Sequence, residues 1–305
     1  FFPAQRIVGS AIAAFDIALW DIKGKALGVP IYDLLGGRVR DKVICYPHNN
    51  GHALEVAPLV ESCLRTKEEG WKFVRWGLPQ DGTIFEPRQA VLASIAQFEA
   101  VREAVGDEIE LIFDVHTRLD LPDALWLCQE VEPLRPYFIE DPLRSENPDS
   151  FKTLRPRTTV PLAAGEQFSS KWEFRQMVEE EWIDYARIDL CIAGGFTEAR
   201  KIAGWCETHF IKVVVHNPLG PVSSAACLQF NMATSNFGVQ EQPRKPGDVL
   251  GDVVPIQPTW EDGYMIPTGL PGLGIEFDRE AAKKHPMQSR ELPQLRRLDG
   301  SFTNW

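Results

Sequence analysis

Six acidic or histidine residues recur along the chain at nearly constant spacing, each at the end of a short apolar run. They are Asp114, Glu140, Glu166, Asp189, His216 and Glu241, and neighbouring members of the set are 23 to 27 positions apart. One such residue alone is more often a helix cap, an ion-pair partner or a solvated loop residue. Independent caps have no reason to fall at the same point of six successive units, so we interpret the set as one functional site.

The first three members of the set offer only oxygen to a ligand. Asp114, Glu140 and Glu166 are carboxylates, which suit a hard cation such as Mg²⁺, whereas zinc prefers nitrogen or sulfur. Asp189 and His216 follow in the next two units. A carboxylate can hold one ring nitrogen of a histidine and leave the other as a general base. A lone histidine would be interpreted as a core residue, but the preceding acid and the loop "HNPLGPVS" favour a catalytic one.

Strand-like runs alternate with helix-like segments, and this alternation would position the six residues. The strand-like runs are "KVICYPH", "KFVRWG", "IELIFDVH", "YFIEDP", "VPLAAGEQ", "DYARIDL", "IKVVVHNP" and "FGVQEQ". Between them lie "PRQAVLASIAQFEAVREAVG", "SKWEFRQMVEEE" and "TEARKIAGWCETHF", where apolar residues return every three or four positions as in an amphipathic helix. Strands that alternate with helices and are apolar on both faces predict a parallel sheet, and eight of them predict an α/β fold, a closed barrel of the TIM type.

The carboxyl ends of the strands in such a barrel form a ring on one face, so the six residues would converge on one pocket. The run "IELIFDVH" ends in Asp114 and His116, which are two positions apart. Because side chains alternate along a strand, we expect both to point into that pocket from a single strand.

Composition and charge argue against several classes of protein. The 305 residues are 44% hydrophobic, which suffices for one large domain, and the formal charge of −11 comes without a basic patch, so nucleic acid is not an expected partner. The apolar stretches are shorter than the roughly 20 residues that a membrane span requires, so no membrane partner is expected. The six cysteines form no CxxC pair and no dense framework, which indicates reduced thiols in a cytoplasmic protein.

Several of the motifs together resemble those of a known family. "FDVH", "FIEDP", "AAGEQ", "RIDLCIAGG", "HNPLGPVSSAACL" and "VQEQ" resemble the enolase superfamily in its mandelate racemase-like subgroup, and most closely the galactonate dehydratase-type acid-sugar dehydratases. The similarity runs from about residue 10 to the C-terminal tryptophan. It implies a modified (β/α)7β barrel with an N-terminal α+β capping domain that is largely missing from this chain. Residues 1–40 would end the capping region, 41–245 form the barrel, and 246–305 return towards the capping domain.

The resemblance also implies a role for each matching residue. Asp114, Glu140 and Glu166 match the family's Mg²⁺ ligands, and in "IEDP" the first of the two carboxylates is the ligand. Asp189 and His216 match its Asp-His dyad. His116 matches its acid histidine, and Glu241 matches its eighth-strand glutamate.

One departure from the family pattern favours elimination over racemisation. The racemases carry a Lys-x-Lys pair at the end of the second strand, where this chain has "VRWG" with Arg75 and Gly77. Glycine cannot transfer a proton, and arginine is too basic to be a good general base, although Arg75 can contact a substrate carboxylate or hydroxyl. The site would then have a base on one face of the substrate only.

The resulting expectation is a Mg²⁺-dependent dehydratase, a carbon–oxygen lyase that acts on a sugar acid such as galactonate. His216 would remove the C2 proton, Asp189 would fix its tautomer, and His116 would protonate the departing C3 hydroxyl. Glu241 would either donate a hydrogen bond in its protonated form or orient a neighbour in its ionised form. The product would be a 2-keto-3-deoxy acid.

Other interpretations remain open at this point. A gluconate or arabinonate dehydratase is the nearest alternative. A divalent-metal hydrolase would normally show a His-x-His pair or a carboxylate that bridges two metals, and an inactive relative would lose members of the polar ring. As partners we expect a small-molecule sugar acid and further copies of the same chain.

Overall fold

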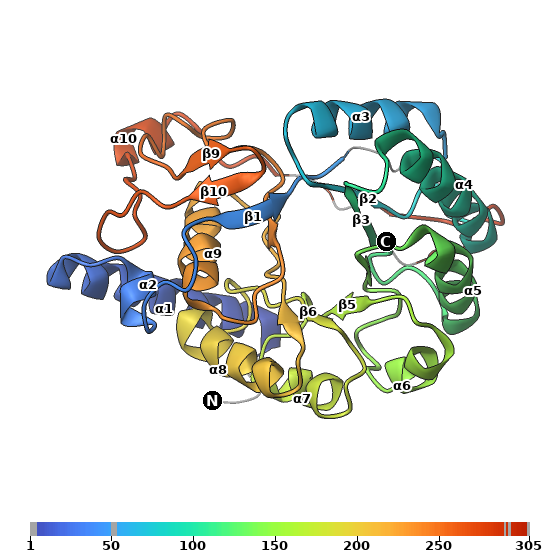
Figure 1. Ribbon diagram of the computed structural model, residues 1–305, viewed down its shortest axis with the longest axis horizontal. Coiled ribbons are helices and arrows are strands. Elements are labelled where there is room, and N and C mark those ends of the chain that lie inside the picture. The colour runs from blue at the N-terminus through green and yellow to red at the C-terminus, as the bar shows by residue number, and fades with distance from the viewer. Residues whose placement is uncertain (1–4, 50–53, 290, 292–293, 304–305) are drawn as a thin grey trace. The chain divides into compact units, whose positions relative to one another are not determined.

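The computed structural model describes residues 5–49, 54–289, 291 and 294–303 of the chain (Figure 1). The chain divides into two compact units, which are described one at a time. Unit 1 comprises Phe1–Tyr46, Gly165–Glu181 and Tyr185–Gln288, and unit 2 comprises Pro47–Ala164, Trp182–Asp184 and Ser289–Trp305.

Unit 2 is built from parallel strands that alternate with helices. The strands are β2 (Phe73–Gly77), β3 (Glu110–Asp114), β4 (Phe138–Glu140) and β5 (Leu162–Ala164), and they pair in this order. The helices are α3 (Ala57–Glu68), α4 (Pro87–Val105), α5 (Leu121–Val131) and α6 (Ser150–Leu154), with short 3-10 turns at Glu132–Leu134 and Arg155–Arg157. Every residue of β4 and β5 is buried, as expected for strands that are covered on both faces.

An aromatic cluster packs α4 against β2 and β3 in unit 2. The ring of Phe98, on the buried face of α4, lies 4.7 Å from that of Trp76 on β2 and 5.1 Å from that of Phe113 on β3. The rings of Trp76 and Phe113 are 5.6 Å apart and nearly perpendicular. Tilted aromatic pairs of this kind contribute about 0.5–1.5 kcal/mol each beyond their buried area. The cluster therefore stabilises the two strands that carry Arg75 and Asp114.

Unit 1 contains the remaining strands. β6 (Tyr185–Ala186) and β7 (Lys212–Val213) are parallel to each other. A second sheet has the order β8-β1-β10-β9, where β8 (Gln240–Glu241) is parallel to β1 (Val43–Tyr46), and β9 (Thr259–Glu261) and β10 (Tyr264–Ile266) form an antiparallel hairpin against β1. The helices are α1 (Gln5–Leu27), α2 (Ile31–Leu34), α7 (Lys171–Glu179), α8 (Gly195–Thr208), α9 (Pro221–Ala233) and α10 (Arg279–Ala282).

The structure confirms the predicted elements and corrects one inference drawn from them. Each of the eight strand-like runs contains a strand. The first two quoted amphipathic segments contain α4 and α7, and the third covers α8 except for its first two residues. The β9–β10 hairpin was not predicted. The expectation that Asp114 and His116 share a strand is wrong, because β3 ends at Asp114 and His116 begins a turn. Of the helices in the described part of the chain, none is both long enough and apolar enough to span a membrane.

Candidate active site

Unit 2 carries two of the predicted metal ligands at adjacent strand ends. Asp114 is the last residue of β3 and Glu140 the last residue of β4, and the two are direct partners in the parallel register. Their side chains are nearly inaccessible, with exposed fractions of 2% and 0%. Two carboxylates at neighbouring buried positions repel each other unless a cation or a proton intervenes, so this pair is electrostatically suited to a bound cation.

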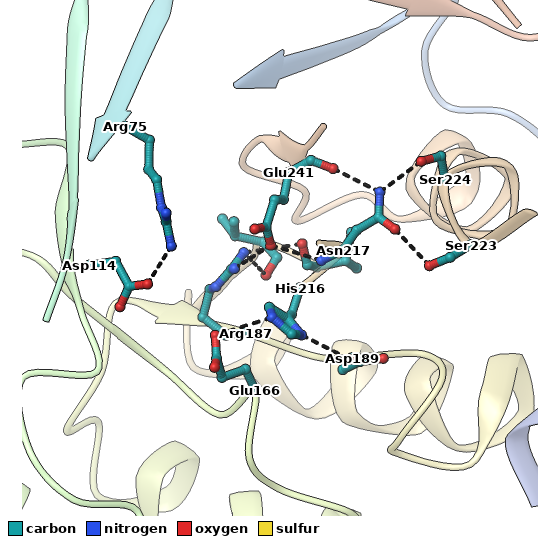
Figure 2. A network of polar contacts seen from close by, with 12 residues as sticks. Arg75, Asp114, Glu166, Arg187, Asp189, His216, Asn217, Ser223, Ser224 and Glu241 are labelled. Carbon is teal, nitrogen blue, oxygen red and sulfur yellow. Dashed lines mark hydrogen bonds and ion pairs between the residues drawn. The ribbon is translucent and has the colours of Figure 1, made fainter. Parts of the chain in front are cut away.

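Arg75 and the turn after β3 both engage the Asp114 carboxylate. The guanidinium of Arg75, from β2, forms an ion pair with Oδ2 of Asp114 (Figure 2). The backbone N–H of His116 donates a 2.7 Å hydrogen bond to Oδ1 of the same carboxylate. Asn49 in turn fixes the backbone of Arg75, since Asn49 N–H donates to the Arg75 carbonyl at 2.8 Å and Asn49 Oδ1 accepts from the Arg75 N–H at 3.1 Å. The structure thus places Arg75 against a predicted metal ligand.

His116 owes its position to an unusual backbone conformation. His116 and Thr117 have φ angles of 55° and 60°, in the left-handed region that residues other than glycine rarely adopt, at a cost of the order of 1–3 kcal/mol each. Two hydrogen bonds offset this cost: His116 N–H to Asp114, and Thr117 N–H to the Asp141 carbonyl at 2.9 Å. The turn therefore depends on Asp114, and the role of His116 as an acid stays a prediction.

Unit 1 brings His216, Asp189 and Glu166 together (Figure 2). His216 Nδ1 lies 2.8 Å from Asp189 Oδ2, and His216 Nε2 lies 3.4 Å from Glu166 Oε2. The other oxygen of Asp189, Oδ1, accepts a 2.6 Å hydrogen bond from the Cys191 N–H. Because an ionised carboxylate only accepts hydrogen bonds, the imidazole must donate from Nδ1, which leaves Nε2 as the proton-exchanging atom.

Burial and the neighbouring charges shift the pKa of His216 in opposite directions. Burial lowers the pKa of His216, but the negative charge of Glu166, the hydrogen bond to Asp189 and the charge of Glu241 outweigh it, and the pKa is raised to about 9. Arg187 opposes this rise. In the metal-free protein His216 is therefore a cation at neutral pH, and Glu166 is one of its counter-ions.

Glu241, the eighth-strand glutamate, is fixed by a buried cation that sequence reasoning missed. Arg187, with no exposed surface, places Nη2 2.5 Å from Glu241 Oε2 and donates from Nη1 to the carbonyls of Val214 and Val215. The same Oε2 accepts a 2.8 Å hydrogen bond from the Asn217 N–H. Of the two forms considered for Glu241, this geometry supports the ionised one. The available signal was the arginine inside the strand-like run "DYARIDL", where it directly follows Ala186 and precedes Ile188.

Asn217 was also missed, although it directly follows His216. Its Nδ2 donates to Ser224 Oγ and to the Glu241 carbonyl, each at 3.0 Å, and its Oδ1 accepts from Ser223 Oγ at 2.6 Å (Figure 2). The fully buried amide therefore ties the loop after β7 to the first turn of α9 and to β8. This network orients the backbone that carries His216.

The predicted metal-ligand residues fit a hard cation in chemistry and burial. All three are carboxylates, and Glu166 is 4% exposed, similar to its two counterparts in unit 2. Within neither unit do three His, Cys, Asp or Glu side chains of the described residues form a ready-made metal cluster. Glu166 belongs to unit 1, and the other two carboxylates belong to unit 2.

The chain matches two sequence families. The family described as "enolase C-terminal domain-like" matches residues 59–282. The family described as "mandelate racemase / muconate lactonizing enzyme, N-terminal domain" matches residues 3–36. A D-mannonate dehydratase of Caulobacter vibrioides is 37% identical, over 100% of this chain and 81% of the relative. A D-galactonate dehydratase of Variovorax paradoxus is also 37% identical with the same coverage.

Solved structures agree with these sequence matches. An enolase from Pantoea ananatis, crystallised with D-gluconate and Mg, aligns with a TM-score of 0.92 at 28% identity and covers 99% of this chain and 81% of its own. A putative galactarate dehydratase from Agrobacterium radiobacter, bound to Na and L-malate, aligns with a TM-score of 0.91 at 32% identity, covering 99% and 80%. The fold class is therefore the α/β barrel that was predicted, and the chain belongs to the enolase superfamily, in its mandelate racemase / muconate lactonizing enzyme family.

Proposed function

We propose that this chain is an acid-sugar dehydratase, a carbon–oxygen lyase that removes the C2 proton and the C3 hydroxyl of an aldonate such as galactonate. The observation that carries the proposal is His216, which Asp189 fixes on one ring nitrogen while the other ring nitrogen faces a carboxylate. Relatives that match along the whole chain are named D-mannonate dehydratase and D-galactonate dehydratase, which supports the reaction class.

Asp114, Glu140 and Glu166 are proposed to hold Mg²⁺. Their support is the oxygen-only chemistry, the near-complete burial of all three and the Mg in the structure from Pantoea ananatis. A bound Mg²⁺ would stabilise the negative charge that develops on the substrate carboxylate as C2 is deprotonated. Arg75, which contacts Asp114, would supply a further positive charge and a hydrogen-bond donor for the substrate.

Each of two histidines transfers one proton in this proposal. His216 Nε2 takes the C2 proton, and Asp189 stabilises the imidazolium that results. His116 gives a proton to the C3 oxygen as the C3–O bond breaks, so the hydroxyl leaves as water. The electron pair of the C2–H bond forms the C2–C3 double bond, and the enol then tautomerises to a 2-keto-3-deoxy acid.

Glu241 acts in this proposal as a fixed anion rather than as a proton donor. Its carboxylate already accepts hydrogen bonds from Arg187 and from the Asn217 N–H, and both donors are fully buried. A carboxylate with these partners stays ionised, and its charge helps to hold the proton that His216 takes up.

The choice of candidate substrates rests on the names of the relatives and of the solved structures. A dehydratase of D-mannonate or D-gluconate is the second candidate, because the first-matched relatives are named D-mannonate dehydratases and the structure from Pantoea ananatis contains D-gluconate. A hydrolase on the same barrel has no supporting observation among these relatives.

A substrate screen tests the proposal. The purified protein with Mg²⁺ is incubated with D-galactonate, D-mannonate, D-gluconate and an arabinonate, and 2-keto-3-deoxy acid is measured. We expect turnover of at least one aldonate and its loss in His216→Asn. His209→Asn, at the end of α8 and paired with Glu181, is the matched control and should keep full activity. A folded protein that converts none of the four acids would contradict the proposal.

A further inference from the structure

A polar cavity of roughly 490 Å³ lies within unit 2 and is lined by residues with no part in the proposed reaction. Three arginines from three separate segments line it: Arg118 from the loop after β3, Arg144 from the loop after β4, and Arg297 from the C-terminal tail. Among the described residues that line it, Asp120 is the one acid. The ionisable groups at the cavity are therefore mostly cations.

Arg118 is a buried charge whose hydrogen-bond partners are all neutral. Its side chain donates to the Leu78 carbonyl at 2.6 Å, to Gln80 Oε1 at 2.7 Å and, at 3.4 Å, to the Val115 carbonyl. Its exposed fraction is 8%. Burial lowers the pKa of Arg118, and Asp114 opposes that shift while Arg75 adds to it. A guanidinium stays charged in a protein, so this buried cation favours an anion in the cavity beside it.

Arg144 and Arg297 have weak partners that an anion can replace. Arg144 pairs with Glu146, two residues away on the same loop, and the two side chains are 49% and 68% exposed. Arg297 Nη1 donates a long hydrogen bond of 3.4 Å to the Phe85 carbonyl, and it lies 3.8 Å from Glu86 Oε2, which is longer than a hydrogen bond. Exposed or long ion pairs contribute little, so both guanidiniums can turn to a ligand at low cost.

The C-terminal tail that supplies Arg297 is attached to the rest of unit 2. Phe85 N–H donates to the Arg296 carbonyl and Arg296 N–H to the Thr83 carbonyl, each at 2.9 Å, and Leu298 N–H donates to Glu86 Oε1 at 2.8 Å. Thr303, further along the tail, also lines the cavity. The cavity wall is thus held in place by hydrogen bonds of the backbone on both sides of Arg297.

We propose that this cavity binds a small organic anion that carries at least two carboxylate or phosphate groups. Three guanidiniums from separate segments can each meet an oxyanion, and arginine is the side chain best suited to both groups. The volume falls within the roughly 300–1,000 Å³ of small-molecule pockets and exceeds what a single oxyanion needs. The inference goes beyond the proposed function, because no residue assigned to the metal, base or acid lines the cavity.

Equilibrium binding to the whole chain tests the site. Calorimetric titrations use citrate for the carboxylate arm and pyrophosphate for the phosphate arm, with protein freed of divalent ions by EDTA, and acetate at equal ionic strength as the reference. We expect saturable binding of one anion per chain. The pair Arg144→Gln with Arg297→Gln should weaken it by about tenfold or more. The control pair Arg65→Gln with Arg175→Gln changes the net charge equally on exposed helix surfaces and should stay within about twofold.

Each outcome of these titrations decides the proposal. Binding of citrate alone or of pyrophosphate alone supports the site and identifies the anionic group that it prefers. Binding of neither anion above acetate overturns it, as does an unchanged affinity in the Arg144/Arg297 pair or an equal loss in the control pair. The titrations contain no sugar acid, so their result is independent of the proposed dehydratase reaction.

Discussion

His116 and His216 differ in what surrounds them, and this difference separates their proposed roles. His216 has a carboxylate on each side, whereas His116 is held through its backbone N–H by Asp114. In the proposed reaction His216 removes the C2 proton, and His116 protonates the C3 hydroxyl as it leaves. The two chemical events can therefore be uncoupled by substitution.

Replacing His116 by Asn should uncouple exchange from elimination. We expect His116→Asn to exchange the C2 proton with deuterated solvent while dehydration slows by roughly a hundred- to ten-thousand-fold, the usual contribution of a general acid. Nuclear magnetic resonance of the substrate measures the exchange, and keto-acid formation measures the elimination. His285→Asn, an exposed histidine paired with Asp252, serves as the control. Dehydration at the wild-type rate would remove His116 from the mechanism.

Breaking the Arg187–Glu241 pair should be costly for stability. In Arg187→Met the Glu241 carboxylate would stay buried without its guanidinium, and loss of one partner of a buried pair costs about 3–5 kcal/mol. The double variant with Glu241→Met should recover part of this loss, because no uncompensated charge remains. Urea unfolding of both variants measures the difference. A single variant as stable as the wild type would show that the pair contributes no net stability.

The loop after β5 contains a glycine, Gly165, whose missing side chain leaves room for α7. Gly165 follows β5, precedes Glu166 and has a φ of 126°. A Cβ added at this position would lie 2.4 Å from Cε1 and 2.7 Å from Cζ of Phe174, which is buried on α7. The close approach of α7 to this loop therefore requires glycine.

Gly165→Ala should destabilise the protein, by about 2–4 kcal/mol from overpacking and backbone strain together. Gly204, an exposed glycine inside α8 with nothing within 4 Å of an added Cβ, is the matched control. Gly204→Ala should raise stability by about 0.5–1 kcal/mol. Thermal unfolding compares the two. Equal effects of the two substitutions would argue that contact with Phe174 is unimportant.

The elements were largely predictable from the sequence because their signals are local. Alternation of β-branched runs with amphipathic segments located the strands β1 to β8 and helices such as α4, α7 and α8. The β9–β10 hairpin was not predicted, since its strands are partly exposed, which leaves little apolar pattern to detect.

Positions that depend on tertiary context were harder to predict. The left-handed turn at His116 was not predicted, because a histidine in a sequence does not indicate a positive φ. The turn forms through hydrogen bonds to Asp114 and to the Asp141 carbonyl. Arg187 was overlooked because arginine is usually exposed, and only the fold reveals that it is buried against Glu241. The spacing of acids and histidines predicted that His216 and Asp189 would meet, which they do.

The stability of the whole chain should depend on pH when no metal is present. The pKa of His216 is raised from 6.5 to about 9, so the folded state binds its proton more tightly than the unfolded state does. The stabilisation is complete below about pH 6.5 and is lost as the pH rises through about 9, with a total of the order of 3 kcal/mol. Urea unfolding in EDTA between pH 6 and 10 measures this slope, and His216→Asn should lack it. A wild-type slope that the variant shares would assign the titration to other groups.

Mg²⁺ should stabilise the folded protein if the three carboxylates bind it. At about a hundred times its dissociation constant, a ligand of the folded state adds about 2.7 kcal/mol, so EDTA should lower the melting temperature and Mg²⁺ should restore it. Glu140→Gln should abolish most of the Mg²⁺ response. Glu99→Gln, an exposed acid on α4, should leave it intact. A wild-type melting temperature that does not change when Mg²⁺ is added or removed would contradict the metal assignment.

Asp114 and Asp189 share a local arrangement, since each accepts a hydrogen bond on Oδ1 from the N–H two residues later, at 2.7 and 2.6 Å. The reach of that bond is set by the single methylene of aspartate. Glutamate, with one more carbon, would carry its carboxylate past the amide and free the turn that follows the strand. A mutagenesis library that treats the two acids as one class would therefore break the strand-to-loop geometry at both positions. Such a library should offer only aspartate and asparagine at 114 and 189.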